Sequence, residues 1–318
     1  GKFMLLATTV AGIQLQHPVM NAAGPRCKTL EEIEELAGSL TAAIMVGSIT
    51  LQRRDGNEGE VYYSNPLREF SLNSLGLPNR GALYYEEVLP RMQEIAHEAG
   101  KRLVVSVAAI ASVEEYAHLI SLALKSGADA GELNFGCPNV WKGGAQKRIV
   151  CFDPSMVDEI LTQIEQVVNI DFPPPIFIKV SPFSDPVLLG EVASVIAKSP
   201  IVTAVTAINT FPNAFAYKEK GKSAISPQFS KGLAGMAGGS AFKAIGLGQV
   251  MQWRALLPAH IDVIGAGGVR TGQDVLDYRQ AGADAVQVGT AYADEGVTVF
   301  DRILTEYASL VETEAVPI

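Results

Sequence analysis

A cysteine with polar neighbours is the residue in this sequence best suited to acid–base chemistry. Cys137 lies in the segment 132–140, which reads ELNFGCPNV and also contains Asn134 and Asn139. A thiol whose pKa is about 8.5 can accept a proton once it has ionised, and amide side chains beside it can hold a polar substrate. Isolated cysteines are more often buried and structural. The flanking asparagines and proline favour a catalytic role for Cys137.

Glycine-rich turns after two late strand patterns are suited to a phosphate group. Residues 263–269 read VIGAGGV and residues 286–290 read VQVGT. Glycine allows the backbone to approach a ligand closely, and free backbone N–H groups at such turns bind phosphate. One turn alone is more often a simple tight turn, but two in successive βα units favour a phosphate site. The residues expected there are Gly267, Gly268, Gly289 and Thr290.

Single polar residues also end two apolar strand patterns, Lys179 in IFIKV and Asn209 in AINT. A lysine at the end of a buried strand is unfavourable unless it is paired. It either extends to solvent or faces an anionic partner, such as the pyrimidine edge of a reduced flavin. The segment 73–79, NSLGLPN, adds amides and free backbone groups that suit a carboxylate or an imide. Alone, that segment indicates only a turn-rich loop.

The charge balance and the cysteine content restrict the class of protein. The formal net charge of −9 disfavours nucleic-acid binding. The three cysteines contain no CxxC pair, which suits a reducing compartment, and Cys27 and Cys151 are expected to be structural. No apolar run approaches the roughly 20 residues of a membrane helix. We therefore expect a cytoplasmic protein with no membrane segment and no nucleic-acid partner. The four histidines have no metal-site spacing, so no metal is expected.

Short β-branched apolar runs alternate with helical patterns along the 318 residues. The expected strands are 18–22, 42–47, 102–108, 131–135, 175–180, 203–209, 262–265 and 285–289. The expected helices include 30–37, 113–126, 155–168, 186–197 and 274–281. This alternation predicts an α/β fold with a parallel sheet, and the strand count favours a (β/α)8 TIM barrel in a single domain, 1–318. An open doubly wound sheet is the alternative, but it lacks a GxGxxG after the first strand.

Two segments interrupt the alternation, 52–80 and 211–239, and both are rich in glycine or polar residues. Both follow strands, so they should lie on the C-terminal face of the barrel, where barrel active sites occur. Long segments without periodicity are usually functional loops or disordered. We expect them to cover the site.

Together and in order, these segments resemble the dihydroorotate dehydrogenase family, in particular its soluble class with a cysteine base, class 1A. The similarity runs from NAAG at 21–24 to EG at 295–296 and includes every motif described above. It implies an FMN-dependent oxidoreductase that converts dihydroorotate to orotate in pyrimidine biosynthesis. It also implies a soluble electron acceptor such as fumarate, and a homodimer.

The resemblance implies a role for each motif. Cys137 would take a proton from C5 of dihydroorotate while a hydride passes from C6 to flavin N5, and Lys179 would face the flavin N1 region. The residues implied to bind the substrate are Asn73, Leu75, Gly76, Leu77, Asn134, Asn139, Asn209 and Thr210. Those implied to bind the cofactor are Ala23, Gly24, Gly47, Ser48, Lys179, Gly235, Gly267, Gly268, Gly289 and Thr290.

One departure from the family concerns the substrate. Gly47 lies where soluble members usually carry a lysine that touches flavin and orotate, and Arg26 or Lys28 in the first βα loop is the expected substitute. The loop 141–147 is longer than usual and should cover the substrate. Three alternatives stay open: a divergent FMN oxidoreductase for another small cyclic substrate, a non-redox phosphate-binding barrel enzyme, and an inactive barrel kept as a binding module.

Overall fold

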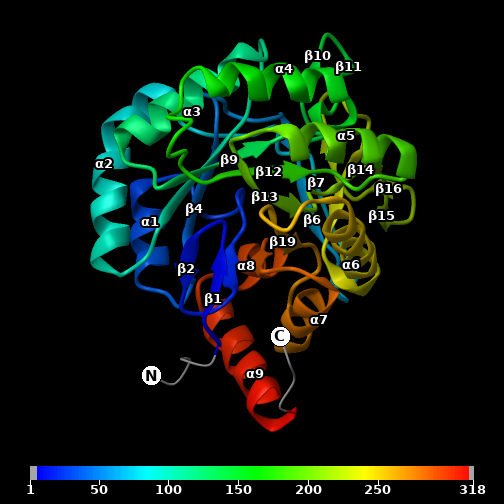
Figure 1. Cartoon of the computed structure of the whole chain (residues 1–318). Coiled ribbons are helices and arrows are strands. Elements are labelled where there is room, and N and C mark those ends of the chain that lie inside the picture. Colours follow the sequence, from blue (N-terminus) through cyan, green and yellow to red (C-terminus); the bar gives the residue numbers. More distant parts are fainter. Residues whose placement is uncertain (1–5, 315–318) are drawn as a thin grey trace.

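Eight parallel strands form the centre of the computed structural model, which describes residues 6–314 (Figure 1). They are β3 (Val19–Asn21), β4 (Ile44–Ile49), β8 (Leu103–Val107), β9 (Ala130–Asn134), β12 (Ile176–Val180), β13 (Val202–Ala207), β19 (Asp262–Ala266) and β20 (Ala285–Val288). Their order in the sheet is β3-β20-β19-β13-β12-β9-β8-β4. The predicted (β/α)8 barrel is confirmed, with every expected strand present. The ends of the predicted single domain, residues 1–5 and 315–318, lie outside the described residues, so the domain prediction stays a prediction.

The barrel closes between β3 and β4 through a side chain. Asn21 is fully buried, and its Nδ2 donates to the Met45 carbonyl at 3.0 Å while its Oδ1 accepts from the Met45 N–H at 2.9 Å. Above this contact, the Gly24 N–H donates to the Gly47 carbonyl at 2.8 Å. The side-chain amide thus pairs backbone groups that would otherwise be buried without partners.

Helices surround the strands on the outside of the barrel (Figure 1). They are α1 (Leu30–Ala37), α2 (Ala82–Glu98), α3 (Glu114–Ser126), α4 (Pro154–Glu165), α5 (Pro186–Lys198), α6 (Gly239–Leu256), α7 (Gly272–Ala281), α8 (Thr290–Glu295) and α9 (Thr298–Glu314), with a short 3₁₀ turn at Val150–Phe152. Local signals set several starts: Thr29 and Glu32 form a capping box at α1, and Asp185 caps α5 ahead of Pro186. No helix within residues 6–314 is both long and apolar enough to cross a bilayer.

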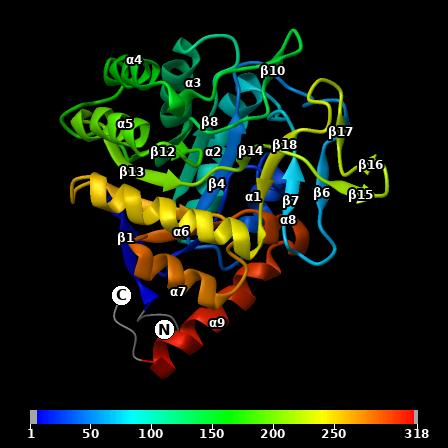
Figure 2. The ribbon, with the colours of Figure 1, turned by 90° about the vertical axis from the view of Figure 1, so that its right-hand side faces the viewer.

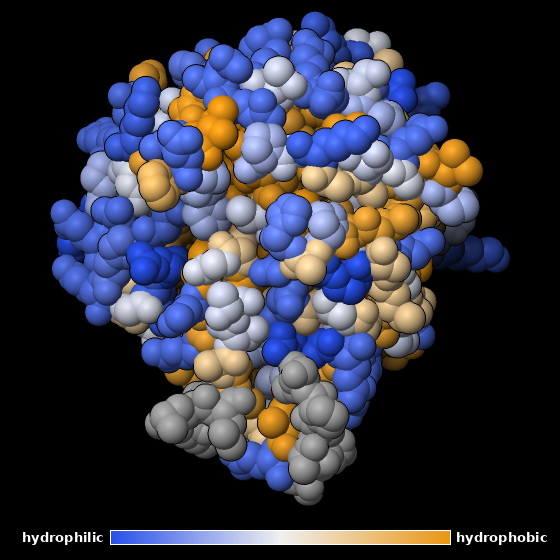
Figure 3. Space-filling model, in the orientation of Figure 1, coloured by the Kyte–Doolittle hydropathy of each residue, from blue (hydrophilic) through white to orange (hydrophobic). Residues whose placement is uncertain are grey.

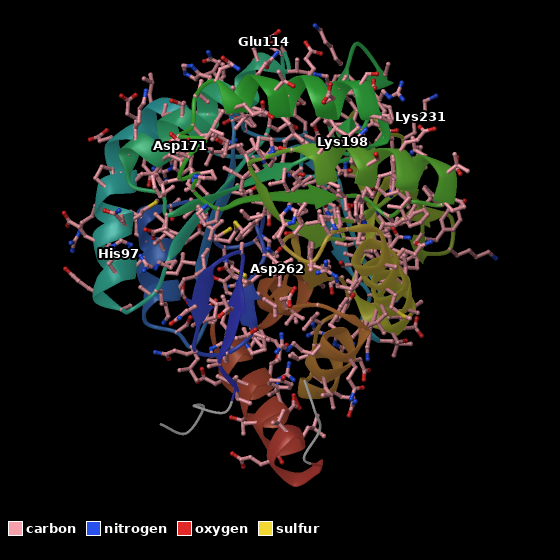
Figure 4. All side chains as sticks on the ribbon, in the orientation of Figure 1. His97, Glu114, Asp171, Lys198, Lys231 and Asp262 are labelled. Atoms are coloured by element: carbon pink, nitrogen blue, oxygen red, sulfur yellow. The ribbon has the colours of Figure 1, made fainter. Side chains whose placement is uncertain are left out.

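An N-terminal hairpin fills one end of the barrel. It consists of β1 (Thr8–Val10) and β2 (Ile13–Leu15), and it was not expected from the sequence. Val10 and Leu15 are buried in one apolar cluster with Phe177 of β12. The Ala11 N–H donates to Oδ2 of Asp262, at the start of β19, over 2.7 Å. Figure 4 labels Asp262 near the middle of the view, beside this hairpin. The site must therefore lie at the opposite end.

The two segments expected as long loops contain short strands instead. These are β5 (Gly59–Glu60), β6 (Tyr62–Ser64), β7 (Ser71–Asn73), β14 (Phe211–Ala214), β15 (Tyr217–Glu219), β16 (Lys222–Ser223), β17 (Ser226–Pro227) and β18 (Ala234–Ala237). Four of them form an antiparallel sheet, β14-β18-β7-β6, which we call the cover sheet. Figure 2 shows it on the side toward which the β13 arrow points. Strands of two to four residues are too short to show a detectable hydrophobic period in the sequence.

Side chains inside the barrel form an apolar layer and then a polar one. The apolar layer lies next to the hairpin and includes Met20, Met45, Val104, Phe177 and Ile264. Ala130, Ala204 and Ala285 belong to the same apolar cluster. Two residues after Val104, Ala130, Phe177, Ala204 and Ala285 come buried polar side chains, which are Ser106, Glu132, Lys179, Thr206 and Gln287. Alternate residues of a strand face the same side, so this polar layer lies between the apolar floor and the open end of the barrel.

The outer surface is largely hydrophilic on the face shown in Figure 3, with apolar residues in several separate groups. Exposed apolar side chains come from different elements, for example Leu83 of α2, Phe172 before β12, Val187 of α5 and Met251 of α6. Scattered exposure of this kind is normal on protein surfaces. The functional site is therefore sought in the interior.

Candidate active site

One cavity lies between the C-terminal ends of the barrel strands and the cover sheet. It encloses about 1210 Å³ of non-protein space, part of which is open to solvent. Most of the residues singled out from the sequence line it. They are Ala23, Gly24, Ser48, Asn73, Leu75, Gly76, Leu77, Asn134, Cys137, Asn139, Lys179, Asn209, Thr210, Gly267, Gly268, Gly289 and Thr290.

Gly47, expected at the cofactor, is not among the residues that line the cavity, and its contact with a cofactor stays a prediction. Its carbonyl accepts from the Gly24 N–H and lies 3.2 Å from Cys27 Sγ. Its φ is +120°, and a Cβ there would lie 2.5 Å from the Ser106 carbonyl oxygen. The backbone at Gly47 therefore has no room for a side chain.

Gly235, the second residue expected at the cofactor, also lies outside the cavity lining. It pairs with Asn73 between β18 and β7, and a Cβ at this position would overlap Thr210 Oγ1. Glycine is needed here so that the cover sheet can pack against Thr210. The structure thus gives Gly235 a packing role, and the expected contact with a cofactor stays a prediction.

The glycines at one end of the cavity differ in what surrounds them. Gly267 and Gly268 have φ values of +126° and +71°, and a Cβ on Gly268 would approach the Gly239 carbonyl oxygen to 2.6 Å. Gly268 is therefore required by packing against the start of α6. A Cβ on Gly289 would meet only the Ala22 methyl group, at 3.7 Å, and Gly289 lines the cavity. A side chain at Gly289 would enter the cavity itself.

A cation that the sequence analysis missed lies at this glycine-lined end. Arg270 lines the cavity, and its Nη1 donates to the Arg68 carbonyl at 2.8 Å. Within residues 6–314 it has no acidic partner within 4 Å. Lys243, in the first turns of α6, is a second cation, but its Nζ forms ion pairs with Asp274 and Asp277 at 2.7 and 2.6 Å. Backbone N–H groups and Arg270 together suit an anion such as a phosphate. The signal in the sequence was a basic residue directly after the glycine turn.

Cys137 is partly exposed on the cavity wall, in an environment that disfavours its ionised form. Burial raises the pKa of this thiol to about 11, although the Asn139 backbone and the positive charge of Arg54 oppose the shift. The thiol pKa of about 8.5 expected from the sequence is therefore too low for this site. At neutral pH only a small fraction is thiolate, so a reaction that needs the thiolate accelerates as the pH rises.

The asparagine side chains near Cys137 hold one another in fixed orientations. Asn139 Nδ2 donates to Asn73 Oδ1 at 2.8 Å, and Asn209 Nδ2 donates to Asn134 Oδ1 at 3.0 Å. Asn134 Nδ2 in turn donates to Ser48 Oγ at 3.0 Å. These bonds leave the side-chain amide protons of Asn73 and the side-chain oxygen Oδ1 of Asn139 for a ligand. A cyclic amide or imide presents the matching acceptor and donor.

Lys179 is buried at the middle of the cavity. Its Nζ has one acceptor among the described residues, Gln287 Oε1 at 3.3 Å. Burial lowers the pKa of this lysine, and the negative charge of Glu132 opposes that shift. The remaining ammonium protons can be donated to a ligand above. Gln287, which also lines the cavity, was not identified from the sequence.

The two candidate substitutes for the missing lysine are placed differently. Arg26 is exposed, and its Nε and Nη2 donate to the Ala293 carbonyl at 3.1 and 3.0 Å. Lys28 lines the cavity, and its Nζ makes no hydrogen bond or ion pair within residues 6–314. Of the two, Lys28 alone is positioned to meet a ligand. The loop 141–147, expected to cover the substrate, forms the hairpin β10 (Trp141–Lys142) and β11 (Ala145–Gln146), outside the cavity lining.

No group of three or more His, Cys, Asp or Glu side chains within the described range is arranged to hold a metal ion. His17 is buried, with its ring nitrogens engaged by the Leu40 carbonyl and the Val19 N–H, and burial lowers its pKa to about 4. Cys27 and Cys151 are buried as well, and burial raises the pKa of both thiols. These residues pack the fold and do not reach the cavity.

Known proteins resemble this chain over nearly its whole length. Dihydroorotate dehydrogenase A (fumarate) of Lactococcus lactis subsp. lactis is 33% identical over 310 residues, covering 97% of this chain and 94% of the relative. Dihydroorotate dehydrogenase (fumarate) of Kluyveromyces lactis is also 33% identical, over 93% of this chain and 90% of the relative. A crystal structure of DHODH from Eimeria tenella in complex with ferulenol superposes with a TM-score of 0.81 over 98% of this chain and 86% of that one. At 18% identity, that last likeness shows the fold alone.

A family profile matches still more directly. Residues 5–311 match the profile of dihydroorotate dehydrogenase, which is most of the chain. The cavity at the C-terminal ends of the strands, with its glycine turns, buried lysine and asparagine set, accords with that match. This chain belongs to the dihydroorotate dehydrogenase family of oxidoreductases.

Proposed function

We propose that this protein is an FMN-dependent dihydroorotate dehydrogenase in which Cys137 is the catalytic base. The observation that carries this proposal is that three kinds of group line one cavity. An anion end has glycine turns and Arg270, the middle has the buried ammonium of Lys179, and the far end has Cys137 with the asparagine amides. A flavin mononucleotide needs the first two, and a dihydropyrimidine needs the third.

The residues at the anion end and in the middle fit FMN. The backbone of Gly267, Gly268, Gly289 and Thr290 would hold the phosphate together with the Arg270 guanidinium. Lys179 would donate to the N1–C2=O edge, where negative charge develops on reduction. Bound FMN supplies a hydride acceptor, which no amino-acid side chain can provide.

The far end of the cavity would bind and deprotonate the substrate. The Asn73 and Asn139 amides would pair with the ring N–H and C=O groups, and their mutual hydrogen bond sets their orientation before the ligand arrives. Cys137 Sγ would take the proton from C5. The cover sheet would exclude water, which strengthens each of these interactions.

The same proposal includes the electron acceptor, the class within the family, the location, the oligomeric state and the pathway. The two relatives described above are named for fumarate, which supports a soluble acceptor of that kind and assignment to class 1A. A cytoplasmic homodimer is proposed with it. Pyrimidine biosynthesis is the corresponding process.

A second candidate is a divergent FMN oxidoreductase that acts on another small cyclic substrate. It is favoured by Gly47, where no lysine side chain fits. A neutral dihydropyrimidine would need no cation there. The family membership sets aside the non-redox barrel enzyme.

The proposal is tested with the purified protein. We expect a yellow protein with noncovalent FMN in about one copy per chain. Anaerobic mixing with dihydroorotate should bleach the flavin absorbance, and dihydrouracil, which lacks the carboxylate, should do so more slowly. Bleaching by dihydrouracil alone would favour the second candidate. A colourless protein that binds no added FMN would contradict both.

A further inference from the structure

A buried carboxylate lies beneath Lys179, and the proposed reaction gives it no role. Glu132 of β9 is fully buried in the polar layer of the barrel. Its Oε2 accepts from Thr206 Oγ1 at 2.9 Å and from Gln287 Nε2 at 3.0 Å, whereas its Oε1 has no hydrogen-bond partner among residues 6–314. An ionised carboxylate in such a place is costly unless a positive charge compensates it.

Lys179, the member of the same polar layer that lines the cavity, supplies that positive charge. In the parallel pairing of β9 and β12, Glu132 is opposite Phe177. Lys179 comes two residues after Phe177, so it lies nearer the C-terminal ends of the strands and the cavity. Among the described residues the two groups make no ion pair within 4 Å, yet the charge of Glu132 acts on Lys179. Their interaction is therefore not a direct contact.

Gln287 of β20 connects the two charges. Its Nε2 donates to Glu132 Oε2, which turns its Oε1 toward Lys179 Nζ at 3.3 Å. An amide held at its donor end by a carboxylate can only offer its acceptor end to the ammonium. One ammonium proton of Lys179 is thus donated to Gln287, and the other two remain for a ligand in the cavity.

The other groups that face Lys179 carry no charge. Cys27, from the loop between β3 and α1, is a buried thiol whose pKa is raised by burial, so it is neutral. Thr206 of β13 and Ser106 of β8 are hydroxyls of the same layer. Glu132 is therefore the acidic group that compensates Lys179 in the described part of the chain.

We infer that Glu132 is a positioning residue: through Gln287 it keeps Lys179 charged and directed into the cavity, toward the N1 side of the flavin. The inference rests on the proposed function, because the group above Lys179 is then FMN. Burial alone would neutralise the lysine, since buried lysines can have pKa values of about 5 to 6. A neutral Lys179 would no longer stabilise negative charge at N1.

Sulfite affinity of the FMN-bound protein measures this charge without catalysis. Sulfite adds to flavin N5, bleaches the visible absorbance and leaves negative charge at N1, so its affinity depends on a cation there. The variants are Glu132→Gln, Lys179→Met as the baseline without the cation, and Thr206→Val as the matched control. Thr206→Val removes one hydrogen bond from the same carboxylate but keeps its charge.

The pH dependence distinguishes the outcomes. In the parent protein and in Thr206→Val, sulfite affinity corrected for sulfite ionisation should stay nearly constant between about pH 6 and pH 9. In Glu132→Gln it should fall about tenfold per pH unit above the lowered pKa of Lys179, toward the Lys179→Met value. A Glu132→Gln profile parallel to that of the parent overturns the inference. If Glu132→Gln does not fold, Gln287→Met carries the test: it should weaken sulfite binding, and parent-like binding overturns the inference.

A second readout separates failure of this inference from failure of the proposed function. In Glu132→Gln the folded pKa of Lys179 should lie further below its unfolded value than it does in the parent. The unfolded variant then binds more protons than the folded one over a wider pH range, so the stability of the variant rises with pH relative to that of the parent. The gap in Tm between the variant and the parent should narrow from about pH 6 to pH 9. A protein without FMN would refute the proposed function, and this gap would still test the charge pair. A gap that does not change with pH overturns the inference.

Discussion

Replacing Lys28 with methionine should weaken binding of orotate far more than binding of uracil. Lys28 lines the cavity from the loop after β3, and its backbone is fixed by Glu32 Oε1 and the Tyr85 hydroxyl at 3.0 and 2.6 Å. Its ammonium is uncommitted among the described residues, so it can meet the carboxylate that orotate has and uracil lacks. Methionine keeps the length and the apolar stem while removing the charge.

The magnitude follows from the position of the ammonium. A charge-assisted hydrogen bond contributes about 1.5–3 kcal/mol, and an exposed ion pair at most about 1 kcal/mol. Lys28 is half-buried, and the ligand would displace water from it, so the lower part of the first range applies. About 1.5–2.5 kcal/mol corresponds to a roughly 10- to 60-fold rise in the Kd of orotate. The expected change for uracil is close to none.

The assay is titration of the FMN-bound protein with orotate and with uracil, followed by the change in flavin absorbance. Arg26→Met is the matched control, because Arg26 is held on the Ala293 carbonyl outside the cavity and should leave both affinities unchanged. Gly47→Lys is not informative, because a Cβ there would strike the Ser106 carbonyl. If Lys28→Met bound orotate as tightly as the parent, or lost uracil to the same extent, the reasoning would be refuted.

Three further predictions follow from the cavity and the barrel seam. Gly289→Val should abolish FMN retention without lowering the Tm of the cofactor-free protein. Gly268→Val should lower that Tm, because a Cβ at Gly268 meets α6 and the φ of this residue is +71°. The flavin content and the melting curves of the two variants check both results. Cys137→Ala should slow flavin reduction about 10²–10⁴-fold with little change in orotate affinity. In the parent the rate should rise with pH toward about 11, because burial raises the pKa of Cys137 and the thiolate is the base; a stopped-flow rate that does not change with pH would contradict this. Asn21→Ala should cost about 2–5 kcal/mol of unfolding free energy, since two buried backbone groups lose their partner, and an unchanged denaturation midpoint would exclude the role of Asn21 at the seam.

Much of the fold and part of the site could be predicted from the sequence because their signals are local. A strand buried on both faces is a continuous apolar run, so all eight barrel strands could be recognised. In a barrel, residues at the C-terminal ends of such strands meet at one mouth. Cys137, Lys179 and the glycine turns could therefore be assigned to one site before any distance was known, and they line one cavity.

What only the tertiary structure decided depends on pairs of residues far apart in the chain. The cover sheet has strands of a few residues, and the pairing of Gly235 with Asn73 comes from segments with no period of their own. The same holds for Glu132, which looks like an ordinary strand residue until Gln287 links it to Lys179. The sequence could not distinguish Arg26 from Lys28 as the cation at the cavity, nor show that the thiol pKa rises to about 11. Both depend on burial and on the direction of a side chain, which the packing of distant segments determines.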